Sequence, residues 1–194
     1  MRSIRSLQEI IFPNRCLGCS ALGLEICSSC RGNWHPHIYR TFSSWQPHFP
    51  IYSAVSYSAI AGKILLAAKE NSLKVADELI LQALKHSLRS CIQERGIGFL
   101  VPIPSRKSVA RKRGRQFINE LTLSLSQNSH LAYYENLTHI RKVQDQSSLD
   151  AKGRYANLDG SMRSLRYLSG RAILIDDLVT TGATLSEAAR ALRI

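Results

Sequence analysis

A short apolar run followed at once by two acids constrains this chain more than any other feature of its sequence. Ile173, Leu174 and Ile175 form the run, which is typical of a strand buried on both faces of a parallel sheet. Asp176 and Asp177 follow at the point where such a strand should end. Because open α/β sheets bind their ligands beyond the carboxyl ends of the strands, the two carboxylates are predicted to lie at a binding site.

A small, hydroxyl-rich turn comes next and leads into a helix. The turn comprises Thr180, Thr181, Gly182, Ala183 and Thr184, and apolar residues from Leu185 to Leu192 then share one helical face. Backbone N–H groups at a helix start attract phosphate, and a glycine lets the phosphate approach the backbone. Carboxylates beside such a turn suit ribose hydroxyls or the water shell of Mg²⁺. The stretch predicts a sugar 5-phosphate site; an unrelated phosphate loop and an ordinary strand–turn–helix are the alternatives.

The residues from Ile173 to Leu185 resemble the phosphoribosyl-pyrophosphate (PRPP) motif of type I phosphoribosyltransferases, which reads apolar strand, two acids, spacers and T-T-G-x-T. The resemblance implies that Asp176 and Asp177 are the catalytic pair and hold the ribose hydroxyls. It implies that residues 180–184 bind the 5-phosphate, and that Mg²⁺ bridges ribose and pyrophosphate. Receiver domains also carry an acid pair after a strand, but their phospho-acceptor Asp lies well downstream, and no Asp follows Asp177 here.

Two C-x-x-C pairs near the start of the chain indicate a metal site. Cys16 and Cys19 form the first pair, and Cys27 and Cys30 form the second. Each pair can place two sulfurs on one ion, and four thiolates with no open position make a closed, structural Zn²⁺ site. An iron–sulfur centre and disulfides are the alternatives, and a reducing cytoplasm disfavours the disulfides.

Length and charge bound the class of protein. The chain has 194 residues, enough for one moderate domain and a small appendage, and a formal net charge of +12. A basic balance favours anionic partners such as phosphorylated metabolites, nucleic acid or a membrane surface. Because no apolar run is long enough for a membrane span and no signal-peptide core is present, a cytoplasmic location is expected. The expected domains are residues 1–50, with an N-terminal helix, the cysteine module and a linker, and residues 51–194.

A dense basic segment follows the strand predicted around residues 99–103. Its candidates for contact with pyrophosphate or nucleic acid are Arg106, Lys107, Arg111, Lys112 and Arg113. Cationic side chains suit a pyrophosphate leaving group, but they equally suit nucleic-acid phosphates or a solvated helix face. One helix is expected through much of residues 108–126. Further helices are expected around residues 4–12, 60–68 and 73–91, and strands at 51–57, 131–134 and 137–140.

A polar segment over residues 141–162 is a candidate for a loop that closes over substrate, or else a plain surface loop. Its candidate residues are Gln146, Arg154 and Asn157.

Taken together, the motif order resembles the ComF family of phosphoribosyltransferase-like proteins, which is linked to DNA uptake in competent bacteria. The cysteine module comes first, then a V-P-x-P strand end, a basic helix start, a Q-x-x-L…R-x-x-N loop and the PRPP motif. The resemblance implies a type I phosphoribosyltransferase-like parallel sheet flanked by helices, with structural Zn²⁺ and with Mg²⁺ on PRPP. It implies single-stranded DNA and a competence helicase as partners.

The sequence departs from that family in two places. Many relatives read R-G-F-N-Q where this chain has Arg113-Gly114-Arg115-Gln116-Phe117, so no role is carried over for the Asn and Gln. Relatives also usually continue with a further strand beside the motif strand, and without it an unpaired edge is expected. The expected function is PRPP binding with transfer of phosphoribosyl to a nitrogen acceptor. The alternatives are a non-catalytic PRPP- or nucleotide-binding regulatory module and a DNA-binding accessory protein.

Overall fold

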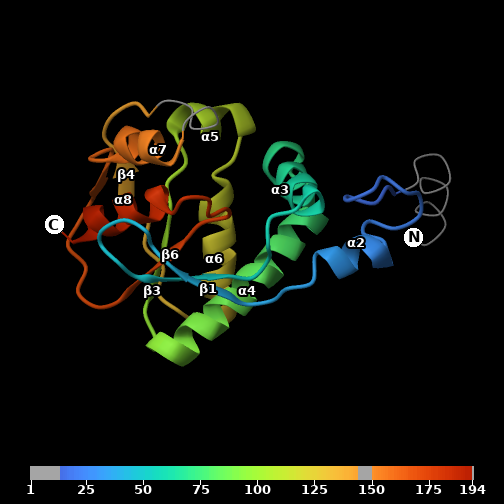
Figure 1. The fold of residues 1–194 in the computed structure, drawn as a ribbon, viewed down its shortest axis with the longest axis horizontal. Helices are drawn as coiled ribbons and strands as arrows, with labels where there is room; N and C mark the ends of the chain where they lie inside the picture. The colour runs from blue at the N-terminus through green and yellow to red at the C-terminus, as the bar shows by residue number, and fades with distance from the viewer. Residues whose placement is uncertain (1–13, 144–149, 194) are drawn as a thin grey trace.

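Two parallel strands, β3 (Phe99–Pro102) and β6 (Ala172–Ile175), lie at the centre of the computed structural model, which describes residues 14–143 and 150–193 (Figure 1). Their register pairs Phe99 with Ala172 and Pro102 with Ile175, so both strands end at the same edge. Among the described residues, β6 pairs with β3 alone, whereas Leu100 of β3 also forms a parallel bridge with Tyr133. The predicted combination of helices with parallel strands is therefore confirmed, in a small sheet.

The remaining elements surround this strand pair. They are α2 (Ser28–Asn33), β1 (Tyr39–Phe42), β2 (Pro50–Ser53), α3 (Ala59–Asn71), α4 (Lys74–Arg95), α5 (Lys107–Arg113), α6 (Phe117–Ser129), β4 (Leu137–His139), α7 (Ala151–Leu158), β5 (Met162–Ser164) and α8 (Ala183–Leu192). Strands β1 and β2 form one antiparallel pair, and β4 and β5 form another. The cysteine module lies at the far end of the molecule from the C-terminus, beside α3 (Figure 1).

The two faces of the central strands are covered by different helices. Leu100, Ile173 and Ile175 pack into one apolar cluster with residues of α4 and α6. Val101 and Leu174 belong to a second cluster with residues of α8. Alternate residues of a strand point to opposite faces, so the apolar run of β6 supplies both clusters. This explains why the run carries no polar residue.

Several short elements differ from the sequence-based expectation. The helix expected through residues 108–126 is two helices, because Gly114 adopts a left-handed conformation (φ 69°) that ends α5. The strand expected at 131–134 is wrong, since that segment contributes a single bridge at Tyr133. The linker expected at the end of residues 1–50 contains β1, and the polar segment over 141–162 contains α7 and ends at the first residue of β5. The helix expected at 4–12 lies outside the described residues.

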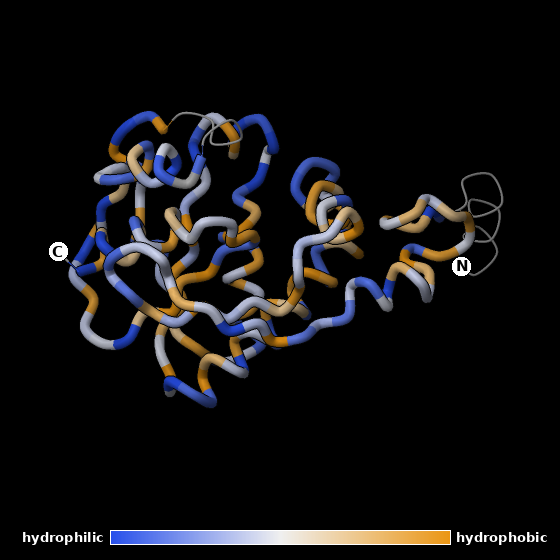
Figure 2. The backbone as a smooth tube through the Cα atoms, viewed as in Figure 1, coloured by the Kyte–Doolittle hydropathy of each residue, from blue (hydrophilic) through white to orange (hydrophobic). Residues whose placement is uncertain are grey.

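In the part of the chain that the structure describes, no helix combines the length and the apolar character needed to cross a bilayer. The segment around α5 at the top of the view is instead strongly hydrophilic (Figure 2).

A buried carboxylate on α8 joins that helix to the β4–β5 pair. Glu187 is 3 % exposed, and its oxygens accept hydrogen bonds from Met162 N at 2.7 Å and Gly160 N at 3.2 Å. Arg190 adds two more, at 2.7 and 2.9 Å, and donates another to the Met162 carbonyl. Burial opposes the charge, but the bonds from Arg190 and the backbone outweigh it and lower the pKa of Glu187.

This network predicts a pH-dependent loss of stability in Glu187→Gln. A neutral amide cannot replace the charge-assisted acceptor. The free energy of unfolding, measured in urea at pH 7, should therefore fall by about 2 kcal/mol. Because the folded pKa is depressed, the contribution of Glu187 is present above the ordinary pKa and is lost as the pH falls through the folded value. The wild type and the variant should therefore converge in acid. Glu78→Gln, at an exposed position of α4, should change neither the free energy of unfolding at pH 7 nor its dependence on pH.

Candidate acid-pair site and cysteine cluster

The acid pair lies where β6 ends. Asp176 and Asp177 follow Ile175 directly, and the Asp177 N–H donates to Asp176 Oδ1 at 2.9 Å. Burial, followed by the adjacent charge of Asp177, raises the pKa of Asp176 well above its ordinary value. The site therefore holds two carboxyl groups that disfavour being ionised together, a property that a bound cation or a proton relieves.

A lysine that the sequence analysis missed already balances part of this charge. Lys69, in the last turn of α3, forms an ion pair with Asp177 Oδ2. The side chain of Asp177 is 8 % exposed and that of Lys69 is 21 % exposed, so the pair is largely shielded from water. No local pattern marks Lys69, because more than a hundred residues separate it from the acids. Its one signal is a cation in the last turn of a helix that is otherwise largely apolar.

The hydroxyl-rich turn forms the start of α8, as predicted. Gly182 caps the helix with φ 75°, a left-handed conformation that favours glycine. Ala183 N approaches Thr181 Oγ1 at 3.4 Å, and Thr180 accepts a hydrogen bond from Arg154 Nη1 at 3.3 Å. Thr184 lies within the first turn of the helix. The turn thus presents hydroxyls and helix-start N–H groups beside the acid pair, and these are groups that bind phosphate.

Two of the three candidate loop residues lie in the part of the chain that the structure describes. Arg154 and Asn157 lie on α7, and Arg154 reaches the turn through Thr180. Gln146 lies outside the described residues. Next to Arg154, Tyr155 stacks on Trp45 with ring centroids 4.3 Å apart. Trp45 belongs to the connection between β1 and β2, so the N-terminal part of the chain touches the same helix that contacts the turn.

The basic segment divides into paired and solvent-facing cations. Because β3 and β6 end together, α5 begins at the edge of the sheet that carries the acid pair. Arg113 forms an ion pair with Glu70 of α3, and Arg106 donates to the Val143 carbonyl at 3.2 Å. Lys107, Arg111 and Lys112 are exposed. Since Glu70 follows Lys69, the end of α5 lies over the part of α3 that contacts the acids.

A hollow of about 150 Å³ opens beside the acid pair. Its lining includes Asp176 and Asp177 together with aromatic side chains, among them Trp34 and Tyr57. Trp34 follows α2 and is buried. The cysteine module therefore contributes directly to the wall of a cavity at the candidate site.

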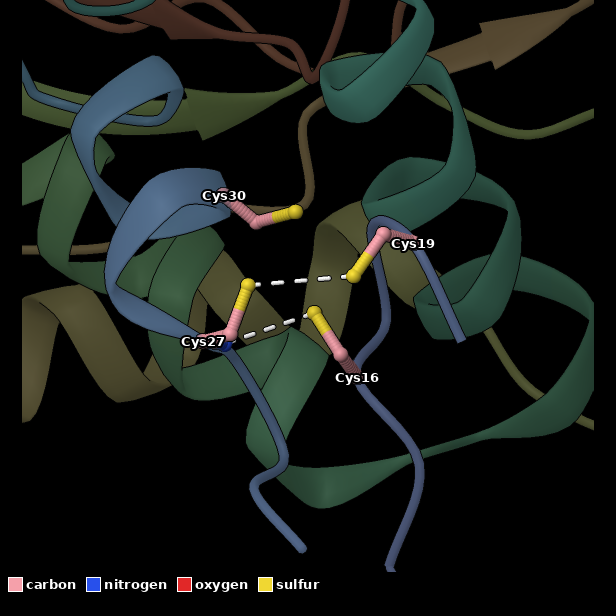
Figure 3. A group of neighbouring side chains, drawn as sticks. All are labelled: Cys16, Cys19, Cys27 and Cys30. Atoms are coloured by element: carbon pink, nitrogen blue, oxygen red, sulfur yellow. Dashed lines mark hydrogen bonds between the residues drawn. The ribbon is translucent and has the colours of Figure 1, made fainter. Parts of the chain in front are cut away.

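The four cysteines predicted to hold a metal form one cluster. The Sγ atoms of Cys16, Cys19, Cys27 and Cys30 all lie within 4.8 Å of one another and converge on a common centre (Figure 3). Zinc bonded to sulfur at about 2.3 Å in a tetrahedron separates the sulfurs by about 3.8 Å. The 3.7 Å between Cys19 and Cys27 fits that spacing, whereas a disulfide needs about 2.05 Å.

The environment of the thiols also fits a metal. The Cys27 N–H donates to Cys16 Sγ at 3.3 Å and, as the largest contribution, lowers the pKa of Cys16 to about 6. Burial raises the pKa of Cys30 to about 12. A cation at the centre offsets the cost of ionising such a buried thiol. A Cβ at Gly18 would lie 2.6 Å from Cys30 Sγ, so the turn requires glycine.

The comparisons with known proteins add no relative. The chain matches no model of a known protein family, and none of the curated proteins matches it significantly.

Removal of the metal ligands gives the first test of this region. We expect one Zn²⁺ per purified chain, measured by mass spectrometry of the metal, and we expect Cys30→Ser to lose most of it because three thiolates leave the tetrahedron open. Cys91→Ser, on α4 and away from the cluster, should keep a full equivalent. Iron instead of zinc, or equal loss in both variants, would contradict the assignment.

The ion pair of Lys69 gives the second test. Lys69→Met removes a cation that competes with a divalent ion for Asp177, so Mn²⁺ should bind roughly five- to ten-fold more tightly, equivalent to about 1 kcal/mol. The measurement is a Mn²⁺ titration followed by electron paramagnetic resonance. Affinity should fall at lower pH as the raised pKa of Asp176 brings a proton onto the pair. Lys74→Met, at the exposed start of α4, is the control; identical affinities in the two variants would contradict the competition.

Proposed function

We propose that this chain binds PRPP with Mg²⁺ and transfers its phosphoribosyl group to a nitrogen acceptor, as a phosphoribosyltransferase-like protein of the ComF type. One observation carries the proposal. An acid pair at the end of a buried strand stands directly before a hydroxyl-rich turn that begins a helix, so groups for ribose and for phosphate occur in one short segment. Arg154 and the cations of α5 supply positive charge around them.

The chemistry asked of these residues is mainly placement. In this proposal the carboxylates of Asp176 and Asp177 accept hydrogen bonds from the vicinal ribose hydroxyls. The N–H groups at the start of α8 and the hydroxyls of the turn hold the 5-phosphate. When bound, Mg²⁺ would neutralise charge on the pyrophosphate and the acid pair. The acceptor nitrogen displaces pyrophosphate at ribose C1, and the protein contributes orientation and electrostatic stabilisation.

The hollow beside the acid pair supports an acceptor site in this proposal. Trp34 and Tyr57 give it aromatic walls, and the adjoining carboxylates can accept an N–H from a flat heterocycle. The same wall joins the cysteine module to the site, so that a structural metal would help to shape acceptor binding.

A second candidate is binding of single-stranded DNA, with a competence helicase as a further partner. The exposure of Lys107, Arg111 and Lys112 favours it, since these cations lie on one short helix that faces solvent. Both functions can coexist in one chain, because the groups assigned to the ribose and the 5-phosphate lie in the acid pair and at the start of α8, not on α5.

Calorimetry with PRPP and Mg²⁺ tests the main proposal without requiring knowledge of the acceptor. We expect saturable binding in wild type, weakened about ten- to a hundred-fold in Asp177→Asn because a charged acceptor is lost. Asp159→Asn, an exposed carboxylate beyond α7, should bind like wild type. Absence of PRPP binding would overturn the proposal. Binding without release of pyrophosphate across a panel of nucleobases would instead identify the regulatory module.

A further inference from the structure

A compact loop between β1 and β2 carries Trp45. Ser43 closes this loop, because its N–H donates to the Phe49 carbonyl at 3.0 Å and its hydroxyl accepts from Phe49 N at 3.2 Å. The same hydroxyl donates to the Pro47 carbonyl at 2.8 Å. Ser43 is 3 % exposed, so water does not compete with these bonds. The loop therefore holds Trp45 in a defined place.

Trp45 stacks on Tyr155 of α7. The ring centroids lie 4.3 Å apart and the ring planes are inclined by 19°. Aromatic side chains in such an arrangement attract each other beyond the effect of their burial. Both side chains are half-buried. The stack thus joins the β1–β2 loop to a helix that lies more than a hundred residues later in the chain.

Helix α7 depends on this contact for its placement. It has eight residues with Gly153 among them, and a helix of that length is not stable in water by itself. Near its end, Leu158 is 2 % exposed and packs into the protein. Nearer its start, the large side chain with an aromatic partner is Tyr155, which lies on Trp45. The stack therefore fixes how α7 is rotated about its own axis.

Arg154 precedes Tyr155 and lies on a different side of α7, because successive residues of a helix are rotated by about 100°. Tyr155 faces Trp45, whereas Arg154 donates from Nη1 to Thr180 Oγ1 at 3.3 Å. Thr180 belongs to the turn before α8 and is exposed, so an anion bound at this turn would meet the guanidinium there. A rotation of α7 would carry the guanidinium away from the turn.

We propose that Trp45 is a positioning residue for a phosphate group bound at the start of α8, and that it acts through Tyr155 by holding Arg154 at the turn. Arg154 is then a direct ligand of the phosphate, because a guanidinium offers two parallel N–H donors to an oxyanion. The inference rests on the phosphate role that the proposed function gives to the turn. It deepens that role by adding a cation from α7 and a support from the β1–β2 loop.

A purely structural role of the stack has a different signature. Loss of packing would weaken the whole site, whereas loss of the position of Arg154 concerns the phosphate alone. The acid pair supplies an internal reference, because a cation bound by Asp176 and Asp177 uses no group of α7 or of the β1–β2 loop.

The test uses the zinc-loaded 194-residue chain and ribose 5-phosphate, with binding measured by calorimetry without Mg²⁺. Arg154→Gln should weaken binding at least about ten-fold, because a charge-assisted bond is lost. Trp45→Ala should weaken it about five-fold, and Trp45→Phe, which keeps an aromatic ring on Tyr155, should restore most of the affinity. Phe42→Ala, at a 64 % exposed position of β1, is the control and should bind like wild type.

Three further measurements separate positioning from folding. In the double variant Trp45→Ala with Arg154→Gln, the loss should equal that of Arg154→Gln alone, because a residue that acts through another adds nothing once the other is gone. Hydrogen exchange of the α7 amides should become faster in Trp45→Ala but not in Trp45→Phe. The affinity of the acid pair for Mn²⁺, followed by electron paramagnetic resonance, should be the same in all these variants.

Four results would overturn the inference. They are no binding of ribose 5-phosphate to wild type at millimolar concentration, equal affinities of wild type and Trp45→Ala, additive losses in the double variant, and a parallel loss of Mn²⁺ affinity. The proposed function fails in a different way. If ribose 5-phosphate follows the expected pattern but PRPP with Mg²⁺ does not bind, the proposed function is wrong and the positioning role stands. If PRPP binds but Trp45→Ala has no effect, the reverse holds.

Discussion

The parallel pairing of β3 with β6 is the constraint on which the rest of the structure depends. Its register brings the ends of both strands to one edge, and thereby places the acid pair and the basic segment together although they are far apart in sequence. It also divides the core, since alternate residues of these strands pack into two apolar clusters. One cluster includes residues of α4 and α6, and the other includes residues of α8. A shift of the register by one residue would exchange these faces and separate the two strand ends.

The local patterns of the sequence were sufficient for the features whose chemistry lies within a few consecutive residues. The run from Ile173 to Ile175 predicted a buried strand, and the four cysteines predicted a cluster, because spacing alone fixes which atoms can meet. The turn at Gly182 was found for the same reason, since the helix begins where the small residues are.

The features that were missed depend on contacts between distant segments or on single backbone conformations. Lys69 contacts Asp177 only because α3 packs near the end of β6, and the neighbouring residues of α3 do not indicate Asp177 as its partner. The break at Gly114 depends on a single left-handed residue within a pattern that otherwise reads as one helix. Strands β1 and β5 are three or four residues long, too short for a period of two to be distinguished from irregular chain.

Helix α3 contacts both the cysteine module and the acid pair. Lys63 donates to the Gly18 carbonyl at 2.9 Å, and the space at Gly18 is bounded by Ile60, so the start of α3 rests on the first cysteine turn. The same helix ends with Lys69 on Asp177. Both contacts are made by one continuous helix, whose 13 residues are joined by its own hydrogen bonds. The cysteine module and the acid pair therefore share one helix as a structural support, although no residue belongs to both.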